Sequence, residues 1–399
     1  MGGNKTGIAW ADLSYQITEG CMHAGSPACD HCYAEEFAGR FAEEGQPFHG
    51  LVQIRANGHA RWTGLFRERP DRLAAMIGWR GGGESKGPGS RLRVFIGSMT
   101  DTFKEEVSDL FLAAAYAVFG AMGDTHIFQL LTKRPHRALA FFQWLRKETG
   151  GYEPKRLTTV LLNAAEQVLG PKARKKIEAR LLRWRTEVAY PRFPFDNVHL
   201  GSTVENQQTA MLRIPYLLQC DAALYWLSME PLFEAVDIGL CAVSCSCGSK
   251  CDLHRGKGRW VRLRHAVHAD DLGIPLLKAM GGPPAAPGIY LAKSNAHGAL
   301  AVERPGVSGL LGIKPGEFEF LPQIGWVVAG LESGGRARDG EVEHMEHVQA
   351  QCKVAGVPYF GKQLGTRPRY RGQPLKLRHS HGAWMEEWPE HLRVREWPR

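Results

Sequence analysis

Apolar runs that end in small or polar residues recur along this chain, and a helical pattern follows most of them. Such an alternation is typical of repeated β-α units that build a parallel sheet. The predicted strands occupy residues 93–98, 126–131, 197–204, 223–227, 325–329 and 357–361, with a further short element near 7–10 or 13–17. The chain should therefore contain about six or seven parallel strands.

The helical patterns between these runs indicate the fold class. The two clearest cover residues 105–122 and 341–355, and Pro135 suits the first turn of another helix. Successive right-handed β-α-β connections close into a full or partial (β/α) barrel, so we expect an α/β fold of this kind. A doubly wound open sheet is the alternative, because the order of the strands cannot be read from a sequence.

Polar residues collect where the predicted strands end. Barrels place their chemistry at the carboxyl ends of the strands, so these residues are candidates for a site. Any one of them alone can equally be a helix cap or a loop residue. In chain order they are Ser98, Asp101, Thr132, Lys133, Arg134, Ser202, Glu205, Ser228, Glu230, Glu332, Ser333, Lys362 and Gln363.

Two long segments interrupt the β-α rhythm, and neither contains an internal repeat. We therefore treat both as insertions into one barrel. The expected organisation is an N-terminal part of the barrel (1–147), a basic helical insertion (148–194), a continuation of the barrel (195–239), a Cys-, Gly- and Pro-rich insertion (240–322), the end of the barrel (323–366) and a basic C-terminal tail (367–399).

The composition is that of a globular chain with a large core, with 44% hydrophobic and 23% charged residues. No uninterrupted apolar run reaches the roughly 18 residues of a membrane span, and residues 1–10 lack the layout of a signal peptide. We expect a cytoplasmic protein without a membrane partner.

The formal net charge of +9 favours contact with a polyanion. Basic residues concentrate in Lys172–Arg185 and in Arg367–His381. In the first segment Ile177, Leu181 and Trp184 fall on one side of a helix. Nucleic-acid binding and an ordinary solvated helix face both explain this pattern.

Three cysteines, Cys21, Cys29 and Cys32, stand in one short loop before a predicted helix. In a reducing cytoplasm clustered thiols are more naturally metal ligands than disulfides. Three thiolates can hold three irons of a [4Fe-4S] cluster and leave the fourth iron open to another ligand. The alternative is a structural zinc site completed by His23 or His31.

A second group of cysteines lies within the Cys-, Gly- and Pro-rich insertion, close to His254. Four cysteines in one segment can close a tetrahedral zinc site or bind a second iron-sulfur cluster. The remaining two cysteines, Cys220 and Cys352, have apolar helical contexts that predict buried thiols. The four predicted ligands are Cys241, Cys245, Cys247 and Cys251.

The cysteine loop resembles a widened form of the radical S-adenosylmethionine (SAM) signature, with C-x7-C-x2-C spacing in place of C-x3-C-x2-C. Further blocks resemble a phage and prophage family of uncharacterised three-cysteine-motif proteins. They are GCMHAGSPACDHCYAEEFAGR, FIGSMTDTF, FQLLTKRP, NVHLGSTVENQ, LSMEPL, VVAGLESGG and QCKVAGVPYFGKQLG.

This resemblance implies a radical SAM-like barrel in which Cys21, Cys29 and Cys32 bind a [4Fe-4S] cluster whose open iron chelates SAM. Reductive cleavage would yield a 5′-deoxyadenosyl radical, with flavodoxin or ferredoxin as reductant. The resemblance places His31 beside the adenine. It places Ser98 and Asp101 at the methionine amino group, with a helix cap as the alternative for Asp101.

Four further strand-end residues are candidates for contact with a ligand. Glu332 precedes glycines that let the backbone approach a cofactor or substrate closely. Lys133 and Arg134 suit a carboxylate or a phosphate, or else they begin a helix in solvent. Glu230 can orient a substrate or form a salt bridge with one of these bases.

The basic charge and the phage resemblance together favour a nucleic-acid substrate, DNA above all, in a bacterium or a phage-infected host. The expected reaction modifies or rearranges a base, and a base flipped from a duplex could stack on Trp184 or Tyr370. One alternative is a zinc-containing nucleic-acid-binding protein without catalysis. Another is a metal-dependent nuclease that uses Asp101, Glu230 and Glu332.

Overall fold

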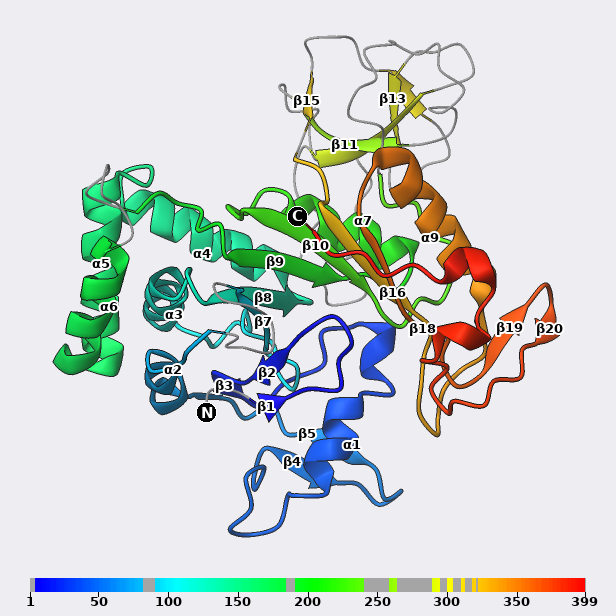
Figure 1. The fold of residues 1–399 in the computed structure, drawn as a ribbon, viewed down its shortest axis with the longest axis horizontal. Coiled ribbons are helices and arrows are strands. Elements are labelled where there is room, and N and C mark those ends of the chain that lie inside the picture. Colours follow the sequence, from blue (N-terminus) through cyan, green and yellow to red (C-terminus); the bar gives the residue numbers. More distant parts are fainter. Residues whose placement is uncertain are drawn as a thin grey trace. The chain divides into compact units, whose positions relative to one another are not determined.

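The computed structural model describes residues 4–81, 90–183, 191–239 and 322–398, together with five strands between residues 258 and 320 (Figure 1). The chain divides into two compact units. Unit 1 contains Met1–His23, Cys32–Gly201 and Cys220–Leu224. Unit 2 contains Ala24–His31, Ser202–Gln219 and Tyr225–Arg399.

The main sheet has eight strands, which are neighbours in the order of the chain. They are β1 (Asn4–Lys5), β2 (Leu13–Tyr15), β7 (Leu92–Ile96), β8 (His126–Thr132), β9 (Val198–Thr203), β10 (Leu224–Met229), β16 (Trp326–Gly330) and β18 (Tyr359–Gln363). Strand β1 is antiparallel to β2, and the other seven run parallel. This sequential order is that of a partial β/α barrel and not the reversing order of a doubly wound sheet, so the predicted α/β class is confirmed.

The predicted strands coincide with observed ones, because parallel strands buried on both faces read as continuous apolar runs. Helix α9 (Val342–Ala355) lies where the helical pattern predicted it. Helix α3 (Asp109–Ala121) begins later than predicted, since Ser108 caps it by accepting a 3.1 Å hydrogen bond from the Phe111 N–H.

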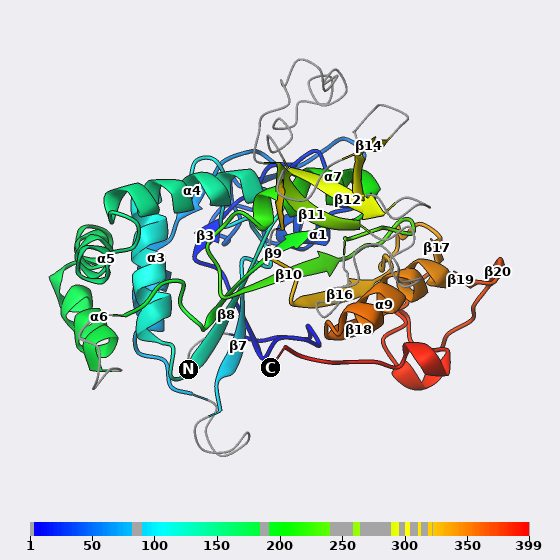
Figure 2. The same cartoon turned by 90° about the horizontal axis from the view of Figure 1, so that it is seen from above.

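Unit 1 carries most of the helices, which pack around α3 (Figure 2). Helix α3 contacts α5 and α6, while α2 contacts α3 and α5. Among the described helices, none is long and apolar enough to cross a membrane. The helices of this unit besides α3 are α1 (Tyr33–Gly39), α2 (Pro70–Met76), α4 (Pro135–Glu148), α5 (Pro154–Leu169) and α6 (Pro171–Arg183).

Two small antiparallel pairs complete the described part of unit 1. The strands β3 (Thr18–Glu19) and β6 (Arg67–Glu68) form one pair. The strands β4 (Val52–Ile54) and β5 (Ala60–Trp62) form the other. The second pair packs against α1 and so lies beside the cysteine loop.

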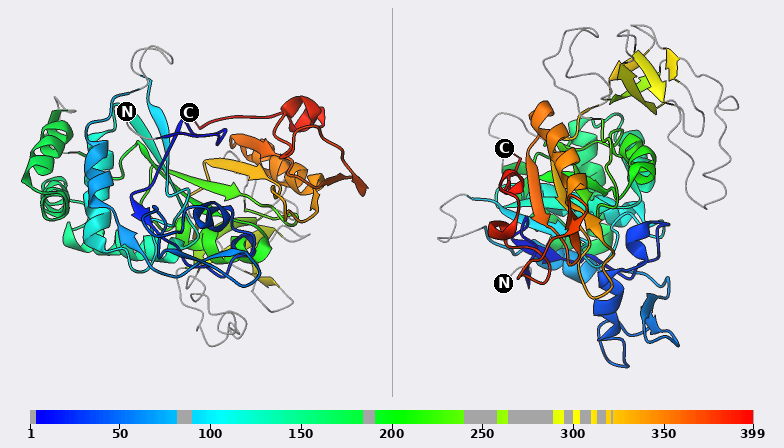
Figure 3. Two further views of the ribbon diagram at one scale, coloured as in Figure 1. Left: turned by 90° about the horizontal axis from the view of Figure 1, so that it is seen from below. Right: turned by 90° about the vertical axis from the view of Figure 1, so that its right-hand side faces the viewer.

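In unit 2, α9 covers β16 and β18 (Figure 3). Helix α7 (Gln207–Leu217) follows β9, and its capping box at Asn206 fixes where it begins. Strand β17, directly before α9, forms a three-stranded sheet with two strands of the C-terminal tail, and the tail also contains two short 3-10 helices. These elements are β17 (Gly340–Glu341), β19 (Pro368–Tyr370), β20 (Gln373–Pro374), η5 (Met385–Glu387) and η6 (Glu390–Leu392).

A second sheet of unit 2 lies in the segment that the sequence pattern treated as an insertion. Its neighbouring strands are antiparallel, in the order β14-β13-β12-β11-β15. Strands had not been predicted here. Their bounds are β11 (Gly258–Leu263), β12 (Ile289–Ser294), β13 (Leu300–Glu303), β14 (Leu310–Gly312) and β15 (Phe318–Phe320).

Two buried histidines on β8 and β9 make the stability of unit 1 sensitive to acid. Burial lowers the pKa of His126 to about 4, and it lowers that of His199 to about 4 as well. The Nδ1 of His126 lies 2.7 Å from Thr125 Oγ1. Its Nε2 is buried without a hydrogen-bond partner among the described residues. A proton on this nitrogen would be a buried, unpaired charge.

We expect the free energy of unfolding to fall as the pH drops from 6.5 to 4. The unfolded chain protonates these two histidines near pH 6.5, whereas the folded chain protonates them only near pH 4, so acid favours unfolding. The loss should be about 2 kcal/mol per buried histidine at pH 5. Urea denaturation at pH 7.5 and pH 5 should show a smaller loss in a His126→Phe variant. The exposed control His49→Gln should match the wild type, and equal losses in all three proteins would contradict this account.

Candidate functional site

The cysteine loop contains a short 3-10 helix, η1 (Pro27–Cys29), directly before α1. The Cys29 N–H donates to the Ser26 carbonyl at 2.8 Å, and the side chain of Cys29 is buried. Cys32 is the N-cap residue of α1, so its position is fixed by the start of that helix. All three cysteines of the loop are free of disulfides.

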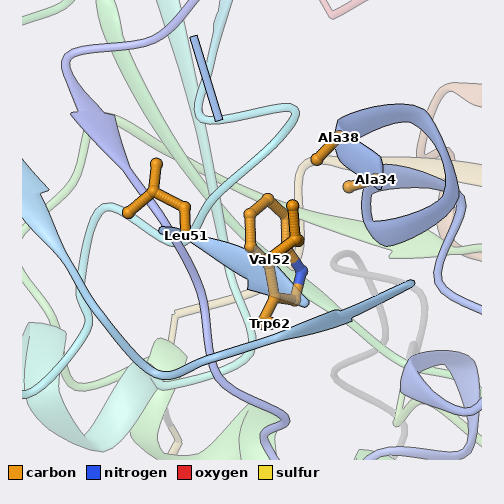
Figure 4. Packing of buried hydrophobic residues seen from close by; sticks show 5 residues of the cluster. All are labelled: Ala34, Ala38, Leu51, Val52 and Trp62. Carbon is orange, nitrogen blue, oxygen red and sulfur yellow. The ribbon is translucent and has the colours of Figure 1, made fainter. Parts of the chain in front are cut away.

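Two of these cysteines, Cys21 and Cys32, pack against the same small apolar cluster. Figure 4 shows its members, which come from α1, from the β4–β5 pair and from the residue directly before β4. The two cysteines are partly buried, so apolar side chains cover one side of each residue. The buried members are Ala34, Ala38, Leu51, Val52 and Trp62.

Glu35 ties the first part of the loop to α1. Its carboxylate is buried and accepts a 2.9 Å hydrogen bond from the Trp62 N–H. His23 Nε2 lies 3.0 Å from the same oxygen, and Arg61 lies 3.7 Å from the other oxygen. The segment after Cys21 is therefore held to the helix that begins after Cys32.

Asp101, predicted to bind SAM or to cap a helix, is buried at the turn after β7. Its carboxylate accepts hydrogen bonds from Thr132 Oγ1 at 2.7 Å and from the N–H groups of Lys133 and Phe103 at 3.0 Å. Arg134 donates to it at 3.2 Å. The carboxylate therefore organises the turn after β8, and Lys133 takes part through its backbone.

Arg134, predicted to contact a substrate, contacts the cysteine loop. It donates to the Met22 carbonyl at 2.9 Å and lies 2.8 Å from Glu105. Burial alone would lower the pKa of Arg134, but the charges of Asp101, Glu105 and Cys21 raise it above its ordinary value. A permanent positive charge near Cys21 favours the thiolate form that binds metals.

Ser98, the other residue predicted at the SAM methionine, lies at the turn after β7. Its hydroxyl is 2.7 Å from Ser14 Oγ and accepts a 2.7 Å hydrogen bond from Gln16. Its carbonyl accepts a hydrogen bond from the hydroxyl of Tyr33, the first residue of α1. Ser98 thus links β2 and the first turn of α1.

In unit 2 the loop is bound by an ion pair that the sequence did not single out. Glu205, directly after β9, is fully buried and lies 2.7 Å from Arg213 of α7. Arg213 also donates to the Thr203 carbonyl at 2.8 Å. The hydroxyl of Ser26 donates to Glu205. The strand-end position of Glu205 was a signal, but nothing in the helical pattern distinguished Arg213.

Glu332, after β16, forms a two-point ion pair with Arg338, at 2.7 and 2.8 Å. Arg338 also donates to the Pro27 carbonyl at 3.1 Å and stacks on the Phe233 ring at 4.1 Å. Burial raises the pKa of Glu332, but Arg338 outweighs it and holds the pKa below its ordinary value. His31 Nδ1 lies 3.4 Å from Glu332, so two residues predicted for the cofactor are brought together.

Glu230, after β10, pairs with Lys362 of β18 at 2.9 Å and not with Lys133 or Arg134. Ser228 donates to its other oxygen at 3.2 Å. The three predicted nuclease ligands therefore have cationic partners already: Asp101 has Arg134, Glu230 has Lys362 and Glu332 has Arg338.

No group of three or more His, Cys, Asp or Glu side chains is arranged to hold a metal ion within the part of the chain that the structure describes. The second predicted group, Cys241, Cys245, Cys247 and Cys251, lies outside the described residues. Trp184 of the basic segment lies outside them too, whereas Tyr370 is in β19.

Comparison with known proteins gives the chain a family. No curated protein and no solved structure matches it. One family model does match, over residues 5–389. The match runs from β1 to the end of the C-terminal tail's first 3-10 helix and so includes every strand of the main sheet. The chain therefore belongs to the family described as protein of unknown function (DUF5131).

Proposed function

We propose that this protein is an iron-sulfur enzyme of the radical SAM type, with Cys21, Cys29 and Cys32 as the cluster ligands. The observation that carries the proposal is how the loop is anchored. Arginine-carboxylate pairs at strand ends contact three successive points of it, at Met22, Ser26 and Pro27. Three free thiols on one short loop are the number of ligands that leaves one iron of a [4Fe-4S] cluster open, so we propose this donor set although the structure does not group the three side chains around one point.

When bound, such a cluster would supply one electron to SAM, which would then break into methionine and a 5′-deoxyadenosyl radical, and the flavodoxin or ferredoxin would reduce the cluster again. The chain's own residues hold the cysteine loop in place and orient it. Arg134 and Arg338 fix carbonyl groups of the loop, and the charge of Arg134 favours a thiolate at Cys21. Asp101 and Glu332 act through these arginines and set their positions.

For SAM itself we propose the contacts that the radical SAM resemblance implies. His31, directly before Cys32, would stack on the adenine, and Ser98 and Asp101 would bind the methionine amino group. Lys362 and Glu230, at the ends of β18 and β10, are then available to a substrate, with Lys133 as a further candidate.

The proposed substrate is a base in nucleic acid, with DNA favoured, and the proposed reaction modifies or rearranges that base. The net charge of +9 supports a polyanionic partner. A cytoplasmic location would supply the reductant, a flavodoxin or ferredoxin, and the reducing conditions that keep the thiols free. Zinc or a second cluster at Cys241, Cys245, Cys247 and Cys251 remains part of the proposal.

Anaerobic reconstitution with iron and sulfide tests the proposal. We expect a [4Fe-4S] signal in the electron paramagnetic resonance spectrum of the reduced protein, and a changed signal when SAM is added, because SAM binds the open iron. An unchanged signal would mean that no iron is open. Zinc alone, without a cluster signal, would favour a zinc-containing nucleic-acid-binding protein.

A further inference from the structure

Helix α6 concentrates positive charge on one element of unit 1. Its sequence, PKARKKIEARLLR, contains six Arg and Lys residues but one acidic residue, Glu178. The whole chain has a formal net charge of +9, so this helix contributes a large part of the excess. Like charges at helical spacing destabilise a helix slightly, so such an excess is not explained by helix formation.

The apolar side of α6 is already used within unit 1. Ala173, Ile177 and Leu181 are buried, and the helix packs against α3 and α5. A helix that lies on a membrane inserts its apolar face into the lipid, and α6 has no such face to offer. Leu182 is exposed, but a single leucine does not anchor a helix to a bilayer.

Two of the six basic residues contact other side chains of the protein. Arg174 lies 3.2 Å from Glu166 and 3.7 Å from Glu178, so its charge is balanced. Arg180 turns inward and donates to the sulfur of Met122. These two side chains therefore contribute to packing.

The other four, Lys172, Lys175, Lys176 and Arg183, are exposed. They make no ion pair with any residue in the described ranges 4–81, 90–183, 191–239 and 322–398. At 3.6 residues per turn they fall within an arc of roughly 100° and extend over about 17 Å of the helix. Among the described residues they form one basic stripe without an ion-paired carboxylate.

We propose that this stripe, defined as Lys172, Lys175, Lys176 and Arg183, binds the phosphate backbone of duplex DNA. Along the axis of the duplex its length equals about five base-pair steps of 3.4 Å, and each step adds one phosphate to either strand. Lysine side chains suit phosphates because they act as point charges and need no base contact. The stripe thus supplies affinity and orientation, and it leaves the reading of a base to residues elsewhere.

Binding of a 30-base-pair fluorescein-labelled duplex by the full-length protein tests this inference, by anisotropy at several salt concentrations. Neither iron nor SAM is added, so the result does not depend on the proposed chemistry. The stripe variant is K172Q/K175Q/K176Q/R183Q. The matched control, R40Q/R55Q/R80Q/K147Q, removes four exposed basic residues of the same unit that lie outside α6.

We expect the stripe variant to bind at least tenfold more weakly at 50 mM salt, and its slope of log Kd against log salt to fall by about 3.6, since each of the four lost phosphate contacts removes about 0.9. The control should keep most of the wild-type slope. Circular dichroism should show α6 still folded, and K175Q/K176Q should show about half the effect.

Equal losses of affinity in the stripe variant and in the control would overturn the proposal, because net charge alone would then govern binding. Wild-type binding to phosphatidylserine vesicles without binding to DNA would also overturn it.

Discussion

A Cys29→Ser protein is expected to lose its cluster and, with it, more than about 100-fold of its ability to cleave SAM. Serine keeps the size of the side chain but replaces a soft thiolate with a hard, protonated hydroxyl. Cys29 is the buried cysteine of the three, so solvent cannot readily supply a substitute ligand. The measurements are iron and sulfide per chain after reconstitution and the rate of 5′-deoxyadenosine formation.

Cys220→Ala and Cys352→Ala are the matched controls for this prediction. Burial raises the pKa of both thiols well above the ordinary value, so they stay protonated and bind no iron. Both variants should reconstitute like the wild type. Full iron content in Cys29→Ser would contradict the assignment of the ligands. If either control lost its iron, the cluster would depend on a thiol other than those of Cys21, Cys29 and Cys32, and the assignment of the ligands would be wrong.

The main sheet was predictable because its strands are buried on both faces. Runs such as those of β7, β10 and β16 are mostly apolar and stop at polar residues, which locates both the strand and its carboxyl end. The order of the strands was not predictable, because pairing depends on contacts that sequence periodicity does not contain. The sheet from β11 to β15 was missed because β13, β14 and β15 have only three or four residues each and because the segment contains many Gly and Pro residues.

The sequence predicted where the candidate residues of the site lie, at the ends of strands, but it did not predict which partners their side chains bind. Asp101, Arg134, Glu230 and Glu332 were singled out because they follow strands, and the structure gives each of them an ion-pair partner. Arg213 was missed since an arginine within a helical pattern ordinarily faces solvent. Arg338 was missed because it follows a glycine-rich turn without any regular pattern. Partners of this kind depend on three-dimensional proximity.

The buried pair of Glu205 and Arg213 gives the second large prediction. In a Glu205→Gln protein the guanidinium of Arg213 would keep its charge in the interior without a counter-charge. Breaking a buried pair in this way typically costs about 3–5 kcal/mol of stability, so we expect a loss of that size in urea denaturation. Ser26 would retain a weaker acceptor, and the cysteine loop would be less firmly held.

The double variant Glu205→Gln/Arg213→Met separates charge burial from loop anchoring. It removes both charges, so most of the lost stability should return. The anchor at Ser26 is still weakened, so reconstituted iron should stay below the wild-type level in both proteins if Glu205 positions the loop. The control Glu166→Gln breaks an exposed pair with Arg174 and should cost less than about 1 kcal/mol without affecting iron. Full iron content in the double variant would show that Glu205 stabilises unit 2 without positioning the cysteine loop.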